Sequence, residues 1–269
     1  STTTTLCHGG QTVLTPNITG VGNGGPYTYN WTPASGNVNT VTVVGNAPLT
    51  AVTNTYAVAI SDGCSVPNAT AIFTVNVNPL PVVSFTTSAL NGCAPLTLTL
   101  TGTSNGASDV FTWGDIANGQ GNPKVVTIPD SGLYSVSVFV TNPVTGCRKD
   151  STRIDYIEVF PQPIASFYAV PPLATILNPN FDFVNTSQGA TSYYWDFGDP
   201  AALNGTNNST AVNPSHGYSY VGEYKVNLVA TSNKGCVDIA YILVEIAPDF
   251  ALYIPNAFTP DGNNVNDIF

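Results

Sequence analysis

One pattern recurs three times along this chain and constrains its fold more than any other feature. A strand that contains a tyrosine and alternates apolar with polar side chains leads each time into a glycine–cysteine turn, which ends at Cys64, Cys147 or Cys236. Another alternating segment follows each turn. Repeats of roughly 80–90 residues with this period-two patterning and frequent turn signals are typical of seven-stranded β-sandwiches. The repeat therefore predicts an all-β protein built from tandem immunoglobulin-like sandwich modules in an extended array.

Proline-containing junctions follow the last alternating segment of each repeat. Proline cannot continue a β-ladder and stiffens the segment that contains it, so we expect semi-rigid links between modules. These junctions predict a first sandwich at residues 1–78, a second at 79–161 and a third at 162–248. Residues 249–269 then form the start of a further domain, a linker or an assembly strand.

Composition excludes two classes of partner. The chain has 16 acidic and 6 basic residues, for a net charge of −10, so it offers no positive surface for nucleic acid. No apolar run approaches the ~20 residues that a membrane span requires. The opening Ser-Thr-Thr-Thr-Thr is no signal peptide and the chain lacks methionine, which together indicate a piece of a longer exported protein.

Five cysteines occupy related places in the repeats. Paired cysteines at equivalent positions predict disulfides and an oxidising compartment. The expected bonds are Cys7–Cys64 in the first repeat and Cys93–Cys147 in the second. The third repeat has no cysteine matching Cys93, so Cys236 is expected to be a buried free thiol or, alternatively, to bridge to another chain.

The third repeat carries a Trp-Asp-Phe-Gly-Asp strand, a Pro-x-His-x-Tyr segment and a Gly-x-Tyr-x-Val strand. The residues of this motif are Trp195, Asp196, Phe197, Gly198, Asp199, His216, Tyr218, Gly222 and Tyr224. Together they resemble the PKD domain, and they are expected to hold the sandwich together and not to bind a ligand. The second repeat resembles a diverged PKD copy, with Phe111–Asp115 in place of the tryptophan strand. The first is similar to the Ig-like repeats of large bacterial surface adhesins.

The end of the chain, Ile254–Asp267, resembles the opening of the gliding-motility-associated C-terminal domain. That resemblance implies export by the type IX secretion system of Bacteroidota and delivery to the cell surface. Oxygen ligands at alternate positions in this segment could bind calcium, or the same side chains could satisfy the turn by themselves. The calcium candidates are Asp261, Asn263, Val265 and Asp267. Ser151 lies in an Asp-Ser-Thr sequence that resembles a Bacteroidota O-glycosylation acceptor.

The sequence has few side chains that could form a catalytic site. The two histidines, His8 and His216, lie in different repeats, so they do not assemble a triad or a zinc site. Asp196 and Asp199 are close in sequence, but we interpret them as turn residues of the PKD-like motif and not as the paired carboxylates of a glycosidase. The sequence predicts no enzyme and no resident cofactor.

Two function classes remain. The first is an extracellular structural or adhesive protein of the bacterial surface, with self-association into a filament through the apolar strand at residues 250–254 or the strand at residues 2–6. The alternative is a glycan-binding accessory module of a secreted hydrolase. In that case Trp31 or Trp113 would be exposed and stack on sugar rings, whereas core packing is the competing interpretation for both.

Overall fold

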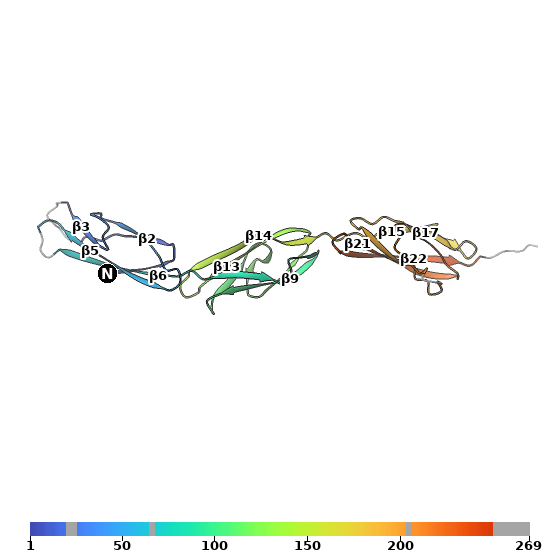
Figure 1. Ribbon diagram of the computed structural model, residues 1–269, viewed down its shortest axis with the longest axis horizontal. Coiled ribbons are helices and arrows are strands. Elements are labelled where there is room, and N and C mark those ends of the chain that lie inside the picture. The colour runs from blue at the N-terminus through green and yellow to red at the C-terminus, as the bar shows by residue number, and fades with distance from the viewer. Residues whose placement is uncertain (20–25, 65–67, 203–205, 250–269) are drawn as a thin grey trace, which may run out of the picture. The chain divides into compact units, whose positions relative to one another are not determined.

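The computed structural model describes residues 1–19, 26–64, 68–202 and 206–249 (Figure 1). Among these residues, the only helical segment is a single 3-10 turn at Asp115–Ala117, and β-strands supply the remaining regular structure. The prediction of an all-β fold is confirmed. No helix in the described part of the chain is long and apolar enough to span a membrane.

The first pair of sheets uses strands from residues 2–78. One sheet has the order β1-β6-β5-β3, and the other pairs β2 with β4. These strands are β1 (Thr2–Cys7), β2 (Gln11–Leu14), β3 (Thr28–Thr32), β4 (Val41–Val44), β5 (Val52–Ser61) and β6 (Ala69–Asn78). Buried side chains from both sheets, including Leu14, Val43, Trp31 and Val75, form one core between the layers.

The second pair uses strands from residues 83–160, with the orders β11-β10-β13-β14-β8 and β12-β9-β7. The strands are β7 (Val83–Thr87), β8 (Asn91–Cys93), β9 (Leu96–Ser104), β10 (Val110–Trp113), β11 (Gly119–Gln120), β12 (Lys124–Ile128), β13 (Gly132–Thr141) and β14 (Arg148–Phe160). Phe85 on β7 packs edge-on against Trp113 on β10, with ring centroids 5.7 Å apart, so side chains from the two layers meet in the core.

The third pair uses strands from residues 167–247, with the orders β15-β17-β20 and β16-β22-β21-β18-β19. The strands are β15 (Phe167–Val170), β16 (Ala174–Thr175), β17 (Asn180–Asn185), β18 (Ser192–Asp196), β19 (Asn208–Ser209), β20 (Ser215–Gly217), β21 (Gly222–Thr231) and β22 (Val237–Ala247). Alternate residues of β17, β18 and β21 face inward, as the period of two requires, and form the third core.

By compactness the chain divides into two units. The first contains residues 1–91 and 95–159, and the second contains residues 92–94 and the chain from residue 160 onward. The first unit thus holds the first pair of sheets and nearly all of the second pair. The domain boundaries at residues 78/79 and 161/162 stay a prediction.

Candidate functional site

The PKD-like motif builds the core of the third pair of sheets. The Trp195 side chain is completely buried, its ring centroid lies 4.8 Å from that of Phe167, and its indole Nε1 donates to the Ala211 carbonyl at 2.9 Å. Phe197 stacks on the His216 ring at 4.4 Å. These contacts place the motif's aromatic side chains in packing roles.

His216 is buried beside the equally buried Asp199, with Nε2 and Oδ2 3.1 Å apart. The Tyr218 hydroxyl donates to the Phe197 carbonyl at 2.9 Å. Burial raises the pKa of Tyr218 above its usual range, and the negative charge of Asp199 adds to this effect. A buried, hydrogen-bonded cluster of this kind fixes the packing of the core and offers no open coordination position.

Tyrosine hydroxyls close a corner in the second and third pairs of sheets. Tyr134 donates to the Asp130 carbonyl and Tyr224 to the Tyr220 carbonyl, each at 2.8 Å. Both tyrosines therefore bond back to the backbone four residues before them.

The cysteines pair differently from the sequence prediction. Cys7 bonds Cys147 and Cys93 bonds Cys236, with Cα atoms 5.5 Å apart in both cases. Each disulfide therefore joins a strand end in one pair of sheets to the turn that precedes the last strand of the next pair. We call these two bonds the staples. Cys236, predicted to be a free thiol or an intermolecular bridge, is buried in the second staple, and the exposed free thiol is Cys64.

Strand length explains why the predicted pairs are wrong. Cys64 precedes the start of β6 at Ala69, whereas Cys7 pairs with Asn78 at its end, nine residues after Ala69. At ~3.3 Å per residue these places are about 30 Å apart, and a disulfide requires Cα atoms within ~7 Å. The second predicted pair fails in the same way, because Cys147 precedes β14 and Cys93 lies beside its far end.

The smaller sheet of the first pair has two strands among the described residues. In the second pair β7 adds to β9, and in the third β15 adds to β17, but no strand in the described part of the chain lies on the corresponding edge of β2. Gly45 N donates to Gly10 O at 2.8 Å, so alternate residues from Gly10 onward bond to β4. The backbone groups of Val13 consequently face the open edge.

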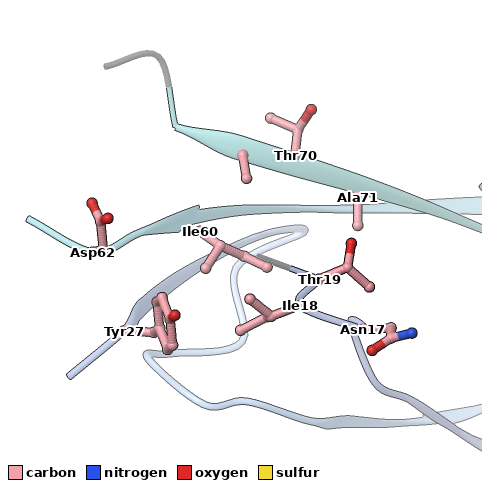
Figure 2. Close-up of a pocket in the computed structure, with 9 residues that line it drawn as sticks. Asn17, Ile18, Thr19, Tyr27, Ile60, Asp62, Thr70 and Ala71 are labelled. Atoms are coloured by element: carbon pink, nitrogen blue, oxygen red, sulfur yellow. The ribbon is translucent and has the colours of Figure 1, made fainter. Parts of the chain in front are cut away.

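In the other two pairs, the strand at this edge carries an aromatic side chain that packs in the core. Phe85 of β7 packs on Trp113, and Phe167 of β15 packs on Trp195. The first pair has a cavity of about 360 Å³ where β5 ends and β6 begins, lined by Ile18, Tyr27, Ile60 and Asp62 among others (Figure 2). Figure 2 shows Ile18, Tyr27 and Ile60 gathered around this space.

The other predicted sites have separate outcomes. Trp31 and Trp113 are 2% and 1% exposed, and their indole Nε1 atoms donate to the Val38 and Gly121 carbonyls. Core packing is therefore the correct interpretation for both tryptophans, and stacking on sugar rings, which needs exposed side chains, is not. Ser151 is half-buried in β14 and its glycosylation stays a prediction.

The calcium candidates Asp261, Asn263, Val265 and Asp267, and the apolar strand at residues 250–254, lie outside the described residues. Within the described residues no group of three or more His, Cys, Asp or Glu side chains is placed to hold a metal ion.

Comparison with known proteins matches residues 161–244 to the PKD domain family, so the chain contains a PKD domain there. The PKD1 domain of the Vibrio cholerae metalloprotease PrtV is 29% identical, with a TM-score of 0.27, over 32% of this chain and 98% of that one. The PKD1 domain of Vibrio anguillarum Epp is 24% identical, with a TM-score of 0.27, over 33% and 96%. The mouse nectin-like molecule 4 ectodomain is 15% identical, with a TM-score of 0.37, over 94% and 100%. A comparison with curated proteins gave no match.

These findings define a tandem of immunoglobulin-like and PKD-type β-sandwiches. The family match is to a PKD domain and not to a catalytic family. Such domains occur in extracellular proteins, and two disulfides fit an oxidising environment. The fold is therefore consistent with an extracellular adhesive or structural module.

Proposed function

We propose that this chain is a non-enzymatic structural or adhesive protein of the bacterial cell surface, in which residues 1–78, 79–161 and 162–248 act as successive load-bearing domains. The observation that carries the proposal is the pair of staples. Each is a covalent link that spans about half of the chain, with sequence separations of 140 and 143 residues. A protein that only presented a binding loop would not need covalent links between consecutive sandwiches.

The cysteine oxidation state tests the extracellular part of this proposal. Protein isolated from its source in the presence of an alkylating agent should show one accessible thiol per chain, at Cys64, and four oxidised cysteines. The Cys64→Ser variant should show none under native conditions. Recovery of all five cysteines as alkylated thiols would place the protein in a reducing compartment and contradict the proposal.

A second candidate function, filament assembly, is favoured by the open edge of β2. An unpaired edge accepts an extended segment through main-chain hydrogen bonds, with side chains of the added strand entering pockets below it. The donor that we propose is the apolar segment 250–254 of a second copy, Phe-Ala-Leu-Tyr-Ile.

Proline substitution tests this assembly. Val13 and Thr42 lie opposite each other in β2 and β4, and the backbone groups of Val13 face the open edge whereas those of Thr42 face the outer edge of β4. Proline is tolerated on a sheet edge but cannot donate to an added strand. We expect Val13→Pro and deletion of residues 250–269 to abolish filaments seen by electron microscopy, and Thr42→Pro to retain them. Filaments formed by the deleted chain would refute the strand-addition version while leaving the structural role intact.

A further inference from the structure

The cysteines of the three glycine–cysteine turns occupy one structural position. Cys64, Cys147 and Cys236 lie between the two longest strands of their sheets, in the connections β5–β6, β13–β14 and β21–β22. Each follows a glycine with a positive φ, of 81°, 72° and 82° respectively. Two of the three cysteines are buried in staples, and Cys64 is exposed and unbonded.

The other halves of the staples also share one position. Cys7 ends β1 and Cys93 ends β8, and each of these strands is the first in the sequence of its sheet and lies beside the last strand of that sheet. The residue after each cysteine donates its backbone N–H to the end of that last strand. His8 donates to the Asn78 carbonyl, and Ala94 donates to the Phe160 carbonyl. A cysteine at the end of the first strand therefore bonds the turn cysteine of the following pair of sheets.

The third pair of sheets has the same position but no cysteine there. Ile176 N donates to Ala247 O, the last residue of β22, so Thr175 is the counterpart of Cys7 and Cys93. The spacing from the aromatic residue of the edge strand agrees, because Phe85 precedes Cys93 by eight residues and Phe167 precedes Thr175 by eight. A second copy of this chain consequently offers Cys64 no first-strand cysteine outside the two staples.

We propose that Cys64 is the open half of a third staple, whose partner is the first-strand cysteine of a sandwich module that precedes residue 1 in the assembled protein. The two cysteines of each staple are separated by nearly the same number of residues, 140 and 143, as expected when one kind of connection is repeated along the chain. The two bonded turn cysteines show what this position does when such a partner is present.

The surface beside Cys64 has a fixed turn and an open cavity that a partner module could cover. Asp62 Oδ1 accepts the Cys64 N–H at 3.0 Å and so fixes the turn, and Asp62 also lines the open cavity with Ile60 and Tyr27. Ile18, at the same cavity, is 38% exposed. A cavity lined by both polar and apolar side chains, next to an accessible thiol, is a surface that a packed partner would cover on forming the bond.

The chemistry is an ordinary disulfide formation. The Cys64 thiol and its partner thiol lose two protons and two electrons as the S–S bond forms, and a disulfide oxidant such as glutathione disulfide takes these up and becomes two thiols. An oxidising extracellular compartment supplies that class of oxidant.

The full chain tests the proposal when a single cysteine is added. Thr175→Cys places a first-strand cysteine on the third pair of sheets, so one molecule can present to another the partner that Cys64 lacks. In a glutathione redox buffer we expect covalent oligomers joined through Cys64 and position 175, with both existing staples intact, read by mass spectrometry of unreduced peptides. The wild-type chain should not form these oligomers.

The matched control is Thr191→Cys, an exposed threonine at the opposite end of the same sheet, next to Ser192, which pairs with Thr231. Linkage of Cys64 to position 175 should exceed its linkage to position 191 by at least about tenfold, because a specific junction raises the effective thiol concentration. Equal yields, or no excess at position 175, would overturn the proposal. Thr175→Cys combined with Cys64→Ser should form no oligomers by this route.

The outcome is independent of filament assembly by strand addition. In a filament of identical copies, Thr175 would occupy the position of the missing cysteine, so Cys64 would remain a thiol. Loss of filaments after deletion of residues 250–269 tests the donor strand, and the ratio of the two linkages tests the third staple.

Discussion

Pulled from its two ends, the oxidised chain should extend to only about a third of the length that it reaches after reduction. The shortest covalent route crosses from Cys7 to Cys147, returns to Cys93 and crosses to Cys236, so most of the backbone never lies in the path of the force. At ~3.6 Å per extended residue, we expect roughly 330 Å for the oxidised chain and about 950 Å for the reduced chain. Single-molecule force spectroscopy measures both values directly.

Single-staple variants provide the matched controls. Replacing Cys7 and Cys147 with serine, or Cys93 and Cys236 with serine, leaves one staple of nearly the same span. Each variant should therefore extend to about half of the reduced length. All chains carry Cys64→Ser to prevent intermolecular bonds. An oxidised chain that extends fully would show that the staples do not carry load, and the proposed structural role would fail.

The Trp195→Ala variant should lose about 3–5 kcal/mol of unfolding free energy in the third pair of sheets, because it removes a completely buried ring from a close-packed core. The substitution also leaves the Ala211 carbonyl without its indole donor and removes the edge contact with Phe167. Denaturant unfolding followed by far-ultraviolet circular dichroism measures this loss.

Tyr194→Ala is the control for this effect. Tyr194 precedes Trp195 in β18 but points to the other face and is 47% exposed. Its removal should change the free energy of unfolding by roughly 0.5 kcal/mol or less. Equal losses in the two variants would show that burial in this core does not determine its stability.

The sheets could be predicted from the sequence because their signal is local. Alternating side chains around Tyr134 and Tyr224 fix both the strands and the corner hydrogen bonds, and the tryptophan strand identifies the PKD-type core. The disulfides could not be paired in the same way, because similar spacing within each repeat favours Cys7 with Cys64. The length of β6 decides otherwise, since a ten-residue strand keeps those two cysteines at opposite ends of one sheet.

The open edge of β2 was also missed. Its sequence signal is a comparison of three repeats, in which Phe85 and Phe167 lie on an edge strand that has no counterpart among the described residues of the first pair of sheets. Alternating side chains predict the strands that a repeat contains, but they give no direct signal for a strand that it does not contain. Pairing partners across a sheet are a tertiary property, and they become visible only once the register is known.

The crossed arrangement of the staples also determines what a protease must do to separate the two ends of the chain. The segments 7–93, 93–147 and 147–236 all join the same two disulfide junctions. A nick in one segment, or in any two, leaves every fragment covalently attached to the rest. Hydrolysis has to reach all three segments before the two ends of the chain separate, so a protein with this connectivity survives isolated cuts in its exposed loops.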